Sequence, residues 1–358
     1  MFSTSEDPTT YEEAAKLKVW REAIESEINA IESNETWYLT DLPKNAKAIG
    51  VKCIFKTKYN EKGKIEKHKA RLVAKGYSQK YGVDYGEVYA PVATWDTIRT
   101  IISLVAHESW PVFQLDVKSV FLYGELMEDV LPEHGFKKCP HEHTLFVKQA
   151  SSQKVLIVSI YVDDLIYTKN DISMMNEFKT SMKDKFAILD LGKMKYFLGV
   201  EVNQSEQGIF IHQQKYGTEI LKRFGMEECN KACSPIVTRC KLVKDENGKT
   251  IDATTYKQII GCLMYLLATR PDLTFAVCLA ARYMERPTEM HLAAVKRIMR
   301  YLKGTLKFGV MYKCKKVNNL TLQGWSDSDY AGDHDDRKST SGYVFTLGES
   351  AICWSSKK

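Results

Sequence analysis

Hydrophobic residues near the N-terminus recur with the period of an α-helix. Between Tyr11 and Ser33 the large apolar residues fall on one stripe, and glutamate and lysine occupy the other faces. The stripe consists of Trp20, Ile24, Ile28 and Ile31. We therefore expect an amphipathic packing helix within residues 1–34. A similar pattern predicts a second helix over Thr97–Glu108.

Strand patterns follow the first helix. Ile49–Tyr59 and Ile65–Tyr77 flank turn residues at Asn60–Gly63, which predicts a hairpin. Val112–Leu115 and Val155–Tyr161 have the apolar, β-branched composition of buried strands. The second of these runs stops at an Asp-Asp pair and resumes after it.

The rest of the chain alternates between helix and strand signals. Asp171 is a suitable N-cap for a helix that reaches Phe186. Another hairpin and a helix ending near Phe224 are expected next. Residues 227–312 then predict three successive helices, and strand signals return after Gly309. The predicted hairpin strands and helices are Tyr196–Val202, Gly208–His212, Tyr256–Leu267, Leu273–Met284 and His291–Leu302.

Charge is concentrated in the predicted N-terminal hairpin. The net charge of the 358 residues is only +6, yet Lys44 to Lys80 contains twelve lysine or arginine residues against two glutamates. With aromatic residues between the charges, this segment suits a nucleic-acid backbone or a triphosphate. A solvated basic face without a ligand is the alternative.

Composition excludes several other classes of protein. Hydrophobic residues make up 44% and charged residues 27%, which is ordinary for a globular protein. Nine scattered cysteines predict neither a disulfide framework nor a zinc site. The apolar runs are shorter than the roughly 20 residues that span a bilayer, and the first twenty residues contain no secretory signal. We expect a soluble intracellular protein, cytoplasmic or nuclear, without membrane contact.

Three aspartates carry the candidate chemistry. Asp163 and Asp164 interrupt a buried-type strand pair, where adjacent carboxylates repel one another and lose solvent. Asp116 ends another buried-type strand. If the strands are neighbours, the three carboxylates form a Mg²⁺ site of the two-metal kind, which stabilises attacking and leaving oxygens in an in-line displacement. A solvated Asp-Asp turn is the alternative.

The wider sequence resembles the Pol proteins of copia-type retrotransposons. Tyr161-Val162-Asp163-Asp164 is similar to the reverse-transcriptase signature, and matching stretches follow in order along almost the whole chain. They include Glu35-Thr36-Trp37, Lys69 to Gly76, Gln114 to Lys118, Lys195 to Gly199, Thr269 to Asp272, Arg300 to Thr305, Ser326 to Asp333 and Asp336 to Tyr343.

This resemblance implies an α+β fold with reverse-transcriptase fingers and an antiparallel palm sheet, followed by helices and the first strands of an RNase H-like domain. The expected parts are the N-terminal helix (1–34), fingers and palm (35–226), a helical connection (227–312) and a truncated RNase H-like start (313–358). The implied activity is RNA-directed DNA polymerisation. Its partners are an RNA template, a DNA primer or RNA–DNA hybrid, and dNTPs, and its cofactor is Mg²⁺.

The resemblance also assigns roles to carboxylates. Asp116 matches the first palm carboxylate, and Asp163 and Asp164 match the catalytic hairpin pair, with Asp163 the closer metal ligand. Asp327 matches the first metal carboxylate of RNase H. The chain ends before the remaining RNase H carboxylates would appear, so we expect no RNase H activity.

Four further residues match positions that contact the incoming nucleotide. Lys69 and Arg71 correspond to fingers residues that hold the triphosphate, which suits the forked guanidinium of arginine. Phe121 corresponds to the aromatic gate that excludes a ribose 2′-hydroxyl, with a core phenylalanine as the alternative. Tyr161 opens the signature itself.

One departure from the family affects the expected activity. Between Asp116 and Asp163 the chain has roughly half of the usual residues, and the missing segment is expected near 131–133. That segment normally supports the template and the new base pair, so we expect impaired or absent polymerisation in this truncated copy. The alternative is a non-catalytic retrotransposon remnant that binds nucleic acid.

Overall fold

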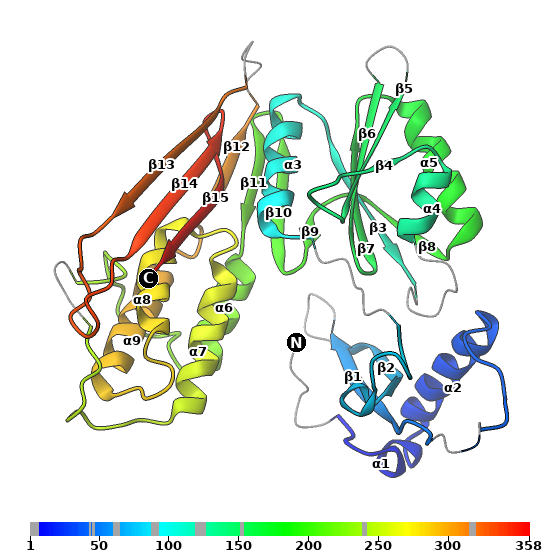
Figure 1. Cartoon of the computed structure of the whole chain (residues 1–358), viewed down its shortest axis with the longest axis horizontal. Coiled ribbons are helices and arrows are strands. Elements are labelled where there is room, and N and C mark those ends of the chain that lie inside the picture. The colour runs from blue at the N-terminus through cyan, green and yellow to red at the C-terminus, as the bar shows by residue number, and fades with distance from the viewer. Residues whose placement is uncertain are drawn as a thin grey trace.

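In the parts of the chain that it describes, a computed structural model shows helices combined with four antiparallel sheets (Figure 1). The structure describes residues 7–42, 44, 47–59, 65–86, 93–118, 127–150, 154–237, 242–314 and 320–358. Within these residues, no helix is long and apolar enough to cross a membrane. The mixture of helices with antiparallel sheets agrees with the α+β class expected from the sequence.

The N-terminal part is a two-stranded hairpin packed on two helices. Its elements are α1 (Tyr11–Ala15), α2 (Lys18–Ser33), β1 (Val51–Tyr59) and β2 (Ile65–Ala74). The expected hairpin is present, although its predicted turn at 60–63 lies outside the described residues. An isolated two-stranded hairpin is marginally stable in water, and the helices supply the apolar cover for one of its faces.

The expected first helix is divided in two. Leu17 adopts an extended backbone conformation between α1 and α2. Ala14 and Trp20 are both buried in one cluster with Phe55 and Ala70 of the hairpin. In a straight helix, residues six positions apart point about 120° away from each other. The break lets both residues reach the hairpin, a tertiary requirement that the helical period does not reveal.

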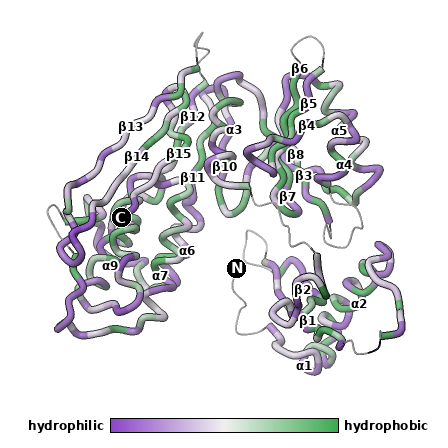
Figure 2. Tube along the Cα trace, viewed as in Figure 1, coloured by the Kyte–Doolittle hydropathy of each residue, from purple (hydrophilic) through white to green (hydrophobic). Residues whose placement is uncertain are grey.

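A six-stranded sheet forms the second part, in the order β4-β5-β6-β7-β3-β8. Helices α4 and α5 accompany it (Figure 1). The element bounds are β3 (Val112–Val117), α4 (Met127–Glu133), β4 (Lys137–Lys138), β5 (Leu145–Ala150), β6 (Lys154–Tyr161), β7 (Asp164–Lys169), α5 (Ile172–Lys185) and β8 (Ile188–Lys193). Hydrophobic residues follow the strands of this sheet (Figure 2). The predicted cap is confirmed, because the Asp171 carboxylate accepts a hydrogen bond from the Met174 N–H at 3.0 Å.

Helix α4 runs across the point where the sequence predicts missing residues. Val130 and Leu131 are buried in the same cluster as strands of the six-stranded sheet, and Phe136 follows them into it. Pro132 lies inside the last turn of the helix. The chain therefore closes over residues 131–133 with a packed helix.

The third part combines two sheets with a group of helices. The four-stranded sheet has the order β12-β11-β10-β9, and the three-stranded sheet has the order β13-β14-β15. The bounds are α3 (Trp95–His107), β9 (Tyr196–Phe197), β10 (Val200–Ser205), β11 (Gly208–His212), α6 (Gln214–Arg223), α7 (Ala253–Leu266), α8 (Thr274–Ala281), α9 (Glu289–Gly304), β12 (Gly309–Lys313), β13 (Leu322–Ser328), β14 (Ser341–Leu347) and β15 (Ser350–Lys357).

One strand predicted in this region is interrupted. The expected strand Tyr196–Val202 is split into β9 and β10 by a tight turn at Leu198 and Gly199. Both residues have positive φ angles, 46° and 77°. Glycine adopts such angles freely, whereas leucine pays a steric cost. The turn lets the two strands pair with each other, Val200 opposite Phe197.

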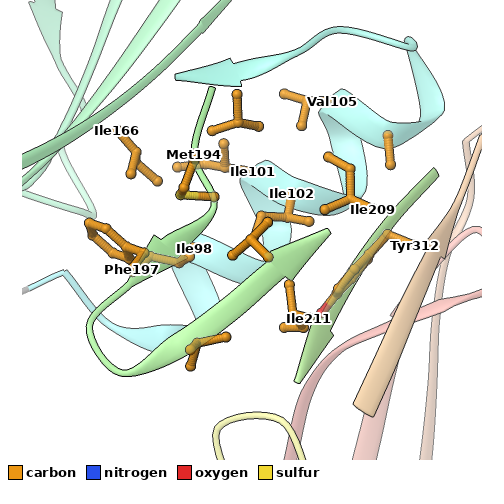
Figure 3. Packing of buried hydrophobic residues seen from close by; sticks show 14 of the residues in the cluster. Ile98, Ile101, Ile102, Val105, Ile166, Met194, Phe197, Ile209, Ile211 and Tyr312 are labelled. Carbon is orange, nitrogen blue, oxygen red and sulfur yellow. The ribbon is translucent and has the colours of Figure 1, made fainter. Parts of the chain in front are cut away.

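A hydrophobic cluster joins α3 to strands from distant parts of the chain (Figure 3). In the picture, Ile166, Met194 and Phe197 gather at one end, and Ile209, Ile211 and Tyr312 lie toward the other. The cluster also contains Ile352 of β15. The C-terminal strand therefore shares a core with residues near position 100.

Candidate active site

Strand pairing brings two of the three candidate aspartates together. Asp116 of β3 lies directly opposite Asp164 of β7 in the antiparallel register. Their neighbours Leu115 and Leu165 are fully buried. Because successive side chains point to opposite faces of a sheet, burying the leucines places both carboxylates on the other face.

Asp163 occupies the turn between β6 and β7. Tyr161 pairs with Asp164 and leaves Val162 and Asp163 as a two-residue loop. Val162 has a φ angle of 56°. A positive angle is rare for a β-branched residue and costs about 1–3 kcal/mol, a kind of strain that gathers at functional sites. The Val117 N–H also donates a 2.8 Å hydrogen bond to the Asp163 carbonyl oxygen, which ties this loop to the strand that carries Asp116.

Gln114 is a site residue that the sequence interpretation missed. It is buried, and its side-chain amide donates a hydrogen bond to the Asp164 carboxylate at 2.9 Å. Gln114 stands two positions before Asp116 on the same strand, so strand alternation puts both on one face. That spacing was the available signal. The bond holds one carboxylate in a fixed orientation beside the other.

The carboxylates crowd one another in a partly buried setting. Burial raises the pKa of Asp116, and the negative charge of Asp163 raises that pKa further. Burial also raises the pKa of Asp164, while the hydrogen bond from Gln114 opposes the shift. A desolvated carboxylate near another negative charge favours its neutral form. A cation between them would relieve both effects.

The N-terminal hairpin has two chemically different faces. Phe55 and Ala70 pair across the strands and face the helices, with Trp20 edge-on to Phe55 at 5.5 Å. Alternation puts the next residues of each strand on the opposite face. That basic face carries Lys52, Lys56, Lys58, Lys67, Lys69 and Arg71.

The positive charges of the basic face affect the pKa of Asp116. The positive charges of Lys58 and Lys69 lower the pKa of Asp116 against the effect of burial. Burial lowers the pKa of Lys69, and the neighbouring Arg71 and Lys58 lower it further. Lys58 was missed from sequence, although its place on the same face as Lys69 follows once the hairpin register is known.

The residues present fit an open type of magnesium site. Mg²⁺ binds oxygen ligands and is commonly held by one or two carboxylates together with waters and substrate phosphates. Across the described parts of the chain, no three His, Cys, Asp or Glu side chains form a ready-made metal shell. The opposed pair Asp116 and Asp164, with its raised pKa values, has the donor chemistry of the open type.

The remaining predicted site residues differ in burial and in their distance along the fold from the aspartate pair. Tyr161 is half-buried and contacts Phe197 edge-on, with ring centroids 6.4 Å apart. Arg71 is exposed on the basic face. Phe121 lies outside the described residues. Asp327 is exposed on β13, opposite Gly342, and Figure 1 draws this strand at the other end of the protein from β3 and β7. The structure therefore does not bring Asp327 to the other aspartates.

Comparison with known proteins shows the family of the chain. The sequence model described as "Reverse transcriptase (RNA-dependent DNA polymerase)" matches residues 34–131 and 126–238, which include all three aspartates and the basic hairpin. The chain belongs to the reverse transcriptases of copia-type retrotransposon Pol polyproteins.

Curated relatives of this reverse-transcriptase chain extend the likeness beyond residue 238. The retrovirus-related Pol polyprotein from transposon RE1 of Arabidopsis thaliana is 36% identical over 394 residues, covering 98% of the chain and 27% of that protein. The one from RE2 of the same plant is 35% identical, covering 99% and 27%. The Pol polyprotein from transposon TNT 1-94 of Nicotiana tabacum is 31% identical, covering 94% and 29%.

The chain spans somewhat more than a quarter of the length of these polyproteins. The RE1 alignment is 394 residues long, whereas the chain has 358, so the alignment contains positions without a counterpart here. The two family matches meet at residues 126–131.

Proposed function

We propose that this chain is an RNA-directed DNA polymerase core that adds dNTPs to a primer 3′-hydroxyl. The observation that supports it best is the placement of Asp116 opposite Asp164, with the Val117 N–H bonded to the carbonyl of Asp163. The opposed pair Asp116 and Asp164, with Asp163 in the adjoining turn, supports a site that a bound metal would complete beside the basic hairpin.

In this proposal, Asp116, Asp163 and Asp164 hold Mg²⁺, with Asp163 the closer ligand of the turn pair. When bound, the metal lowers the pKa of the attacking hydroxyl and neutralises charge on the triphosphate. Gln114 keeps the Asp164 carboxylate oriented, and the turn bond keeps Asp163 in register with Asp116. These residues act by preorganising charge where the reaction needs it.

We assign residues of the N-terminal hairpin to binding of the incoming nucleotide. Lys69 and Arg71 bind the triphosphate, and Lys58 adds positive charge from the paired strand. Tyr161 and Phe121 are proposed to contact the sugar and base. The template and primer strands would follow the same positive potential, so binding should weaken as salt rises.

We assign the parts of the fold accordingly. Residues 35–226, with β1–β2 and the six-stranded sheet, form fingers and palm. Residues 227–312 form a helical connection, and residues 313–358 form the first strands of an RNase H-like domain. In that assignment Asp327 is a metal carboxylate of the RNase H-like part.

A primer-extension assay with a DNA primer on an RNA template, dNTPs and Mg²⁺ tests the activity. Wild type should incorporate nucleotides slowly, because the segment between Asp116 and Asp163 is short, and Asp163→Asn should abolish incorporation. Asp327→Asn is the matched control, because it makes the same chemical change on the exposed strand β13 and should leave extension unchanged. Equal incorporation by wild type and Asp163→Asn would overturn the proposal.

A second candidate is a non-catalytic remnant that binds nucleic acid. The two family matches meet at residues 126–131, and the RE1 alignment contains positions without a counterpart in this chain, which favours the remnant because a shortened segment is expected there from sequence. A remnant would bind a primer–template through the basic hairpin face with salt-dependent affinity and would extend no primer. The extension assay and a binding titration of the same samples separate the two candidates.

A further inference from the structure

Helix α7 reaches a turn beside the candidate active site. The Tyr265 hydroxyl, at the end of α7, donates a hydrogen bond to the carbonyl oxygen of Leu198. Tyr265 also lies against Gly199: a Cβ built there would be 3.0 Å from the tyrosine hydroxyl oxygen and 3.2 Å from a ring carbon. The turn between β9 and β10 is therefore covered by one aromatic side chain from a helix more than sixty residues away.

The covered turn has a backbone that needs outside support. Leu198 has a φ angle of 46°, which is unfavourable for a residue with a side chain. Gly199 has a φ angle of 77°, which glycine tolerates. β9 contains two residues, so few strand hydrogen bonds hold this hairpin. The contact with Tyr265 supplies part of the missing restraint.

The residue before the turn touches the Asp-Asp hairpin. Phe197 is fully buried at one end of the cluster drawn in Figure 3. Its ring lies edge-on to Tyr161 at 6.4 Å and to Trp95 at 6.5 Å. Tyr161 pairs with Asp164 and closes the loop that carries Asp163. A shift of Phe197 therefore displaces the tyrosine from which this loop departs.

Tyr265 is itself held in place by distant segments. Arg99 of α3 donates a 2.8 Å hydrogen bond to the Ala268 carbonyl oxygen. The Trp354 indole N–H of β15 donates one to the Leu267 carbonyl oxygen at 3.1 Å. Burial raises the pKa of Tyr265, and charge on Tyr161 and Tyr196 raises it further, which agrees with three tyrosines around one turn.

We propose that Tyr265 is a positioning residue for nucleotide addition: by clamping the Leu198–Gly199 turn, it holds Phe197 against Tyr161 and so sets the loop that carries Asp163. This inference rests on the proposed polymerase function. Tyr265 lies outside residues 34–238, the region that the family model matches, because α7 follows that region in the chain. Helix α7 then contributes to the rate of nucleotide addition through this contact.

The test uses Tyr265→Phe, which removes the hydroxyl and keeps the ring. In single-turnover primer extension, the rate constant should fall roughly five- to tenfold at unchanged amplitude, because a net hydrogen bond is worth about 1 kcal/mol. A purely structural role would lower the amplitude through loss of folded protein and leave the rate constant alone. Amide hydrogen exchange of residues 196–202 should accelerate by a similar factor.

Tyr216→Phe is the matched control. Tyr216 lies edge-on to Tyr265 at 5.1 Å, but its hydroxyl donates to the Cys262 carbonyl oxygen and not to the turn. This variant should match wild type in rate constant and in exchange. The double variant Tyr265→Phe/Phe197→Leu should lose less in rate constant than the product of the two single losses, because Tyr265 acts through Phe197.

The outcomes separate the inference from the function on which it rests. If wild type extends primers and Tyr265→Phe keeps the full rate constant, the inference is overturned and the polymerase stands. If wild type extends no primer, the proposed function fails. Amide hydrogen exchange then tests whether Tyr265 holds the Leu198–Gly199 turn. Faster exchange at residues 161–164 and 196–202 in Tyr265→Phe then supports it, and unchanged exchange overturns it.

Discussion

The side-chain amide of Gln114 donates a 2.9 Å hydrogen bond to the carboxylate of Asp164. Gln114 and Asp116 point to the same face of β3, so one strand supplies a carboxylate and the group that orients a second carboxylate on the next strand. The strand pair therefore carries a supported cluster of aspartates, and several consequences can be measured.

Replacing Gln114 with leucine should destabilise the fold at neutral pH and weaken primer extension. A hydrogen bond to a charged group contributes about 1.5–3 kcal/mol, and its loss leaves the Asp164 carboxylate partly buried without this donor. Urea unfolding at pH 7 measures the loss. Ser159→Ala is the control in the same sheet, because the buried Ser159 hydroxyl has no partner within the described residues. That variant should be neutral or slightly more stable.

Stability should depend on pH through Asp116. Burial and the charge of Asp163 raise the folded pKa of Asp116 above its usual value of 3.8. The folded state then binds a proton more readily than the unfolded state, so stability falls as pH rises from the unfolded pKa through the higher folded pKa and is constant above it. Asp116→Asn removes this loss. Without divalent metal it should be more stable than wild type at pH 7, and the difference should vanish below the unfolded pKa.

Urea unfolding curves between pH 3 and pH 8 in a chelating buffer measure the difference in unfolding free energy between Asp116→Asn and wild type. Asp327→Asn, on an exposed strand, should follow wild type throughout the same range. A constant offset between Asp116→Asn and wild type at every pH would contradict the assignment to proton binding.

Magnesium should stabilise the wild-type fold in the absence of nucleic acid. At about ten times its dissociation constant, a ligand that binds only the folded state adds about 1.4 kcal/mol. Thermal melts with increasing Mg²⁺ should show a rising midpoint for wild type and a much smaller rise for Asp116→Asn. An equal rise in both would place the bound ion elsewhere.

Lys69→Gln should raise the KM for dNTP roughly tenfold or more with little change in primer affinity. The reason is that charge-assisted hydrogen bonds to phosphate contribute about 1.5–3 kcal/mol each. Steady-state extension at varied dNTP measures this effect. Lys18→Gln makes the same change on the exposed surface of α2, where Lys18 pairs with Glu22, and should leave the KM unchanged.

Trp354→Ala should lower the free energy of unfolding by about 2–3 kcal/mol, less than a fully buried tryptophan would lose, because Trp354 is partly buried. The buried guanidinium of Arg99 stacks on the Trp354 ring at 3.9 Å and donates a hydrogen bond to the Ile352 carbonyl oxygen. Trp325→Ala is the matched control, because Trp325 is 56% exposed on β13 and should cost less than 1 kcal/mol. Urea unfolding followed by circular dichroism compares them. Equally small losses would show that Trp354 contributes little to the packing of β15 on α3.

The candidate site was partly readable from sequence. Asp116, Asp163 and Asp164 stood out because carboxylates are rare between buried-type strands, and their partner Gln114 was recoverable from strand alternation. Lys58 required the register of the hairpin. Tyr265 left no local signal, because its role comes from a contact with Leu198, sixty-seven positions away.

The sequence by itself determined the hairpin strands, the burial of Leu115 and Leu165 beside the aspartates, and the capped start of α5 at Asp171. These features depend on periodicity and on bonds between residues a few positions apart, which each segment carries with it. Tertiary structure decided the break before α2, the turn at Leu198 and Gly199, and the docking of β15 on α3. Each of these depends on which distant surfaces meet, because the burial gained there outweighs local backbone preference.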